Sequence, residues 1–113
     1  MNVTITHEGP ITIVDADGVV KLGETAAEFS RWLEKVLRED KGPVIINFEK
    51  VTYMDSTGLG ELVGYLQKFD DQQRAMALVK PSHRISSLME LTKLDSLFRV
   101  FRSVEEAASY LST

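Results

Sequence analysis

The chain has 113 residues, about the size of one domain, and 43% of them are hydrophobic and 27% charged, so we expect a globular fold and not a disordered segment. The formal net charge of −4 disfavours nucleic acid and anionic membranes as partners, because both select clustered lysine and arginine. The lack of cysteine excludes disulfides and thiolate metal sites and fits a reducing cytoplasm, and no segment resembles a signal peptide or a membrane span.

Alternating apolar and polar residues predict strands in the opening segment. One apolar run lies over residues 3–5 and a second over residues 11–13, with a Gly-Pro turn at 9–10 between them. The sequence Asp-Ala-Asp-Gly at 15–18 predicts another turn, followed by a third short strand over 19–22. Because these segments are close in sequence, we expect them to pair antiparallel.

The hydrophobic period then changes to that of a helix. Thr25 and Glu28 fit a capping box, and apolar residues follow at helical spacing until Gly42-Pro43. The apolar run at 44–48 is typical of a strand covered on both faces, and residues 51–54 predict a further short strand.

The second half alternates strands and helices at short spacing, which predicts parallel strands joined by right-handed crossovers. The expected elements are a helix from the Asp55-Ser56-Thr57-Gly58 junction to about Phe69, a strand over 75–79, a helix that begins at Pro81, a last strand over 98–101 and a terminal helix after a capping box at Ser103 and Glu106. We therefore predict one α/β domain over residues 1–113. Its mixed sheet is antiparallel at the start and parallel afterwards, and carries about four helices.

The helix after the junction has one apolar face, at about 100° per residue, which we expect to be core. Its members are Leu59, Leu62, Val63 and Leu66. Gly60 and Gly64 lie on a flank of this helix, and Glu61 points away from the core. A glycine inside a helix costs roughly 0.8–1 kcal/mol relative to alanine. The pair therefore serves either close approach by another protein or tight packing within this domain, and the sequence leaves both open.

Ser56 itself has two interpretations. Serine, threonine and aspartate are the usual helix N-caps, so Asp55, Ser56 or Thr57 could each cap this helix. A helix start also accommodates a phosphate, which would add roughly −1.5 to −2 charges at Ser56. The helix dipole would favour that charge by only about 0.3–1 kcal/mol, and Asp55 would oppose it. Phosphorylation should therefore leave the fold intact. A dianion in a desolvated interface, in contrast, would lower the affinity of a complex enough to dissociate it.

Residues 51–60, with the sequence VTYMDSTGLG, resemble the signature of bacterial anti-sigma factor antagonists in the STAS domain family. The similarity extends over the order of elements, the Asn47-Phe48 strand end and the late Leu88, Leu91, Leu94 and Phe98 pattern. The resemblance implies a protein that binds an anti-sigma factor with serine kinase activity and frees a sigma factor. It also implies that the kinase phosphorylates Ser56 and that a serine phosphatase restores it. The domain would need no cofactor, catalyse nothing itself and work in the cytoplasm.

The resemblance also implies a contact surface. It comprises the 17–24 loop with Lys21 and, around the junction, Asp55, Ser56, Thr57, Gly58, Gly60, Glu61 and Gly64. Many relatives carry a Gly-Glu-hydrophobic-Asp motif before the first long helix. Here the matching stretch is Gly18-Val19-Val20-Lys21, so both acids are absent and one position is a lysine. We therefore expect the partner surface to differ in charge from that of those relatives.

Other functions are weaker predictions. A phosphorelay receiver needs an acidic pair after its first strand to bind Mg²⁺, and here a turn stands in that place. An enzyme is disfavoured because Ser56 has no Gly-x-Ser-x-Gly context and because His7 and His83 are too distant in sequence to suggest a metal site. A STAS scaffold, or a small subunit of a signalling or lipid-transport complex without a phosphorylation cycle, remains as the alternative.

Overall fold

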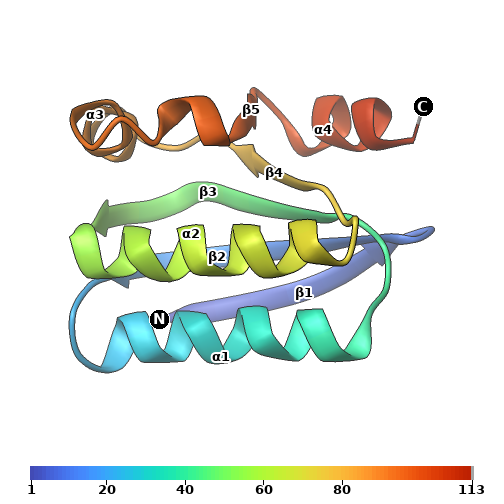
Figure 1. Ribbon diagram of the computed structural model, residues 1–113, viewed down its shortest axis with the longest axis horizontal. Coiled ribbons are helices and arrows are strands. Elements are labelled where there is room, and N and C mark those ends of the chain that lie inside the picture. The colour runs from blue at the N-terminus through green and yellow to red at the C-terminus, as the bar shows by residue number, and fades with distance from the viewer. Residues whose placement is uncertain (113) are drawn as a thin grey trace.

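The computed structural model describes residues 1–112 and contains one five-stranded sheet (Figure 1). Its strands lie in sequence order: β1 (Asn2–Glu8), β2 (Ile11–Val20), β3 (Val44–Met54), β4 (Met76–Val79) and β5 (Arg99–Phe101). β1 pairs antiparallel with β2, and every later pair is parallel. The predicted mixed α/β sheet is therefore confirmed.

Helices cover both faces of this sheet unequally. They are α1 (Glu24–Glu39), α2 (Ser56–Asp71), α3 (His83–Leu91) and α4 (Val104–Leu111), with a short 3₁₀ turn η1 (Asp95–Leu97) before β5. Residues from α1, α2 and α3 share the large core on one face, whereas α4 packs on the other face through Ala107 and Ala108. No helix in the described part of the chain is long and apolar enough to cross a membrane.

Strand β2 corrects the expected turn at residues 15–18 and the separate strand at 19–22. It runs without interruption to Val20, and its pairing with β3 shifts register between Asp15 and Asp17 and again between Gly18 and Val19. Gly18 has φ 123°, a value that disfavours residues with a side chain. A bulged strand and a tight turn select the same small and polar residues, so the sequence pattern could not separate them. Likewise, the two strands expected at 44–48 and 51–54 are one strand, β3.

The helix starts agree in part with the predicted caps. The capping box expected at Thr25 is wrong, because α1 begins at Glu24 after Gly23 and the Thr25 hydroxyl instead bonds the backbone of Lys21. α3 begins at His83 with Ser82 as its cap, and not at Pro81. The cap predicted at Ser103 is confirmed, since its side chain accepts a hydrogen bond from the Glu106 N–H at 3.0 Å.

Helix α2 buries its predicted apolar face, and it also partly buries Glu61. Leu59 and Leu62 are buried, and Val63 and Leu66 are half-buried against the same core. Glu61 does not point away as expected. It is half-buried between the helices and accepts a hydrogen bond from the Ser30 hydroxyl of α1 at 2.8 Å. The position of α1 beside α2, which the sequence of α2 alone does not specify, explains this difference.

Candidate functional site

The loops that follow the parallel strands lie together at the carboxyl ends of these strands. Loop 21–23 follows β2, Asp55 follows β3, and residues 80–82 follow β4. At the left of Figure 1, the first turns of α1 and α2 lie at the same end of the molecule as α3. In open parallel sheets, the carboxyl ends of the strands are where loops can be changed without disturbing the core, and binding sites are usually there.

Asp55 is the residue that caps α2. Its carboxylate accepts hydrogen bonds from the N–H of Gly58 at 2.9 Å and from the N–H of Leu22 at 2.8 Å. Its own N–H donates to the Val20 carbonyl at 3.1 Å. These backbone donors, Gly58 first and Leu22 second, lower the pKa of the Asp55 carboxyl below its ordinary value. Asp55 therefore fixes the end of β2 to the start of α2.

This arrangement predicts an acid dependence of stability. Because the folded-state pKa of Asp55 is depressed, its contribution is complete above the unfolded-state value of about 3.9 and is lost as pH falls through the folded value. Asp55→Asn retains a cap acceptor but has no titrating charge there. We expect urea midpoints of the wild type to fall relative to those of Asp55→Asn as pH decreases below about 4. The matched variant Asp70→Asn, at an exposed site, should track the wild type; parallel profiles for all three proteins would contradict the assignment.

Ser56 is the first residue of α2 and is exposed, as is Thr57. Within residues 1–112, its hydroxyl makes no hydrogen bond, because Asp55 performs the capping. Of the two interpretations of Ser56, capping is therefore excluded. Because the residue is exposed, another protein can reach it.

The three glycines near Ser56 have different surroundings. Gly58 is buried, and a Cβ there would lie 2.5 Å from the Val20 carbonyl oxygen and 2.8 Å from Val20 Cγ1. Close internal packing thus accounts for Gly58, and its contact with a partner stays a prediction. Gly60 and Gly64 are exposed, and a Cβ at either would meet nothing within 4 Å. Packing inside the domain therefore does not explain these two glycines.

Two leucines beside Ser56 are unusually exposed. Leu22 is 74% exposed and Leu91 is 82% exposed. The backbone of Leu22 is bonded to Asp55, and Leu91 lines a groove that Ser56 also lines. Lys21, the lysine at the position of the family acid, is exposed next to Leu22. These exposed apolar side chains near Ser56 make this surface a candidate site.

We call the groove of about 470 Å³ between the start of α2 and helix α3 the Ser56 groove. Its walls are Tyr53, Met54, Asp55, Ser56, His83, Arg84, Ser87, Leu88 and Leu91. From the sequence, Leu91 is placed only in the late Leu88, Leu91, Leu94 and Phe98 pattern, and neither Arg84 nor Leu22 is singled out. Leu91 lies about 200° around the helix from buried Met89, so the helical period alone could have marked it as exposed.

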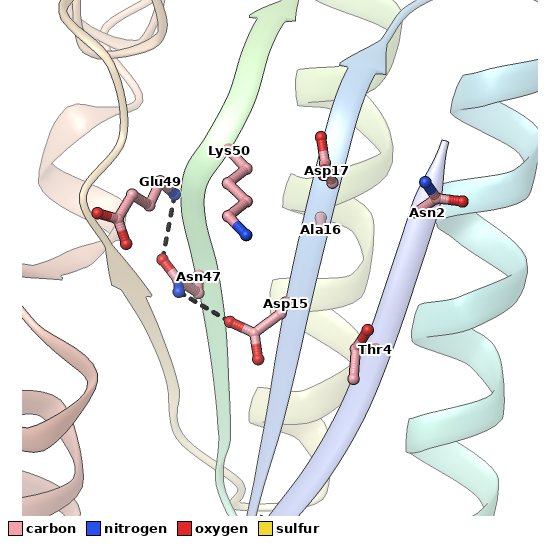
Figure 2. Close-up of a pocket in the computed structure, with 8 residues that line it drawn as sticks. All are labelled: Asn2, Thr4, Asp15, Ala16, Asp17, Asn47, Glu49 and Lys50. Atoms are coloured by element: carbon pink, nitrogen blue, oxygen red, sulfur yellow. Dashed lines mark hydrogen bonds between the residues drawn. The ribbon is translucent and has the colours of Figure 1, made fainter.

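A second hollow, of about 380 Å³, lies on the opposite face of the sheet (Figure 2). Its side chains stand on β1, β2 and β3, on the side away from α1 and α2. Asn47 donates to Asp15 at 2.8 Å and accepts from the Glu49 N–H at 3.1 Å, so its polar groups partly satisfy one another. This second hollow contains neither Ser56 nor an exposed leucine. We therefore assign the candidate site to the Ser56 groove.

Metal ligands are not gathered in the described part of the chain, where no group of three or more His, Asp or Glu residues is placed to hold an ion. His7 contacts Asp40 at 3.1 Å, and His83 contacts the Ser87 hydroxyl at 3.5 Å within α3. Both histidines are exposed.

Known proteins resemble this chain in sequence and in fold. Residues 2–107 match the model of the STAS domain. The anti-sigma-B factor antagonist of Staphylococcus aureus is 33% identical over 81 residues, which cover 72% of this chain and 75% of that protein. Among solved structures, an anti-sigma-factor antagonist (STAS) domain protein from Planctomyces limnophilus superposes with a TM-score of 0.86 at 16% identity, over 98% of each chain. The Bacillus cell fate determinant SpoIIAA, in its phosphorylated form, superposes with a TM-score of 0.74 at 16% identity, over 96% of this chain and 98% of that one. At these identities the two structures establish a common fold.

Proposed function

Because this chain belongs to the STAS domain family, we propose that it is an antagonist of an anti-sigma factor and that phosphorylation of Ser56 ends the interaction. The observation that carries this proposal is the exposure of Ser56, which lines a groove together with the exposed Leu91 and follows Asp55, to which the backbone of the exposed Leu22 is bonded. The curated relative from S. aureus is named for the same activity, and SpoIIAA is known in a phosphorylated form.

The proposed contact surface has an apolar part and a part where the backbone of a partner can come close to α2. The exposed Leu22 and Leu91 would supply apolar anchors near Ser56. The open flank at Gly60 and Gly64 would let a partner backbone approach α2 closely. Lys21 would face an acidic group of the partner. That acidic group would distinguish the partner of this chain from the partners of relatives that carry an acid at this position.

The proposed switch is electrostatic. A serine kinase, which the resemblance identifies with the anti-sigma factor, would transfer the γ-phosphoryl group of ATP to Ser56 Oγ, with release of ADP and the hydroxyl proton. The product carries roughly −1.5 to −2 charges where a neutral hydroxyl had met the partner. Burying that dianion in an interface is costly, whereas at the exposed helix start it leaves the domain folded. A serine phosphatase would reverse the step by hydrolysis. ATP is the phosphoryl donor, so we place this cycle in the cytoplasm.

Two substitutions at Ser56 test the proposal. Ser56→Ala should bind the cognate anti-sigma factor with unchanged affinity and accept no phosphate, because it loses only a hydroxyl that bonds nothing within the described chain. Ser56→Asp should weaken the complex at least about tenfold, which is about 1.4 kcal/mol. Calorimetry measures both affinities, and mass spectrometry after incubation with ATP and the kinase locates the phosphate.

The matched control is Ser109→Asp, which adds the same charge at an exposed site on α4, on the opposite face of the sheet. It should bind as the wild type does. Equal affinities for the wild type and Ser56→Asp would contradict the switch. Binding without any phosphorylation of Ser56 would instead favour a STAS scaffold or transport subunit that has no phosphate cycle.

A further inference from the structure

Arg84 is a cation of the Ser56 groove with no acidic partner. Within residues 1–112 it forms no ion pair, and its one ring contact is with Tyr53, whose centroid lies 5.7 Å from Cζ. A cation–π contact at that distance is near the limit of its range and weak at an exposed site. The guanidinium can therefore leave the ring at little cost.

The start of α2 has few donors left for an anion on Ser56. Asp55 already accepts from the N–H groups of Gly58 and Leu22. The Asp55 carboxylate would repel a phosphate placed against those same groups. Protein donors for a phosphate on Ser56 would therefore have to come mainly from the groove.

The groove offers such donors. Ser56 and Arg84 line the same cavity of about 470 Å³, and His83 lies beside Arg84 on its rim. Arginine is the side chain best suited to phosphate, because its planar fork can donate two parallel hydrogen bonds to two oxygens. We propose that, once Ser56 carries a phosphate, Arg84 leaves Tyr53 and pairs with it. This inference rests on the proposed function for its setting, but its chemistry concerns this chain alone.

The pairing would give the modified protein two properties. It would keep the phosphate within the groove, so that hydrolysis by a phosphatase first requires the Arg84 contact to open. It would also remove the cation from the surface that an unmodified groove presents. Phosphorylation would thus change the groove both by adding negative charge and by occupying Arg84.

The test uses phosphoserine installed at position 56 during translation, so no kinase is needed. Four proteins form a thermodynamic cycle: wild type and Arg84→Gln, each with serine or phosphoserine at 56. The two serine forms should melt at nearly the same temperature. The phosphoserine form with Arg84 should melt about 4 °C above the phosphoserine form of Arg84→Gln. The Nε–H resonance of Arg84 should shift on phosphorylation.

Arg99→Gln provides the matched control. Arg99 is also exposed and also stacks on a tyrosine, with Cζ 5.1 Å from the Tyr110 centroid, but it is on β5 and outside the groove. Its cycle should show no coupling to the phosphate. Zero coupling for Arg84, coupling equal to that of Arg99, or an unchanged Arg84 resonance would overturn the proposal. A kinase that ignores Ser56 would contradict the proposed function and leave this result intact.

Discussion

Gly58→Ala should destabilise the protein by about 2–3 kcal/mol, because the added methyl overpacks a site closed by backbone. The new Cβ would lie 2.5 Å from the Val20 carbonyl oxygen. That oxygen also accepts the hydrogen bond of Asp55 N–H, so moving it disturbs the capped junction. Urea unfolding followed by circular dichroism measures the change.

The same substitution at Gly60 and at Gly64 is the matched control. Both sites are open, so alanine should stabilise α2 by up to roughly 0.8–1 kcal/mol at each position. If the partner rests on this flank, the same two variants should bind it more weakly although they are more stable. Equal stability losses at all three glycines would contradict the distinction between internal packing and open surface.

Arg74→Met should destabilise the protein by about 3–4 kcal/mol, because it removes a buried charged donor from several carbonyl oxygens. The Arg74 side chain is 6% exposed and stacks 4.5 Å from the Phe69 ring. Its guanidinium donates to the carbonyls of Gly42 at 2.8 Å and Leu37 at 3.0 Å, and so closes the C-terminal end of α1. Burial lowers the pKa of Arg74, and Asp40 partly offsets this effect.

Two further variants make the Arg74 prediction specific. Arg74→Lys should recover only part of the lost stability, because one ammonium group cannot reach carbonyls in the different directions that the guanidinium spans. Arg102→Met, at an exposed site, should change the free energy of unfolding by less than about 0.5 kcal/mol. Thermal and urea unfolding would refute the capping role of Arg74 if Arg74→Met behaved like Arg102→Met.

Arg74 also shows where sequence reasoning was least informative. The sequence pattern assigns no structural role to Arg74, which lies in a polar stretch after the helix that ends near Phe69. The structure places Arg74 in the interior, bonded to residues 32 to 38 positions earlier in the chain. No local pattern reports such a contact, because the partners are backbone carbonyls that every residue has.

The Ser56 region shows the opposite balance. The residues of the junction and the hydrophobic period after it located the start of α2, and the signature at 51–60 pointed to the family. Which of the three polar residues caps the helix required coordinates, because aspartate, serine and threonine are all good caps. The coordinates were also needed to explain the glycines. A Cβ added at Gly58 would meet other atoms of the domain, whereas one added at Gly60 or Gly64 would meet none within 4 Å.

By itself the sequence determined the four helices, the mixed sheet and the position of Ser56 at a helix start. These follow from hydrophobic period and capping chemistry, which act between residues close in the chain. Only the tertiary structure decided that β2 is continuous, that Leu22 and Leu91 are exposed beside Ser56, and that Arg84 shares a groove with it. Those features depend on which segments the sheet brings together. A contact between residues distant in sequence produces no periodic pattern in the sequence, so it cannot be predicted from local hydrophobicity.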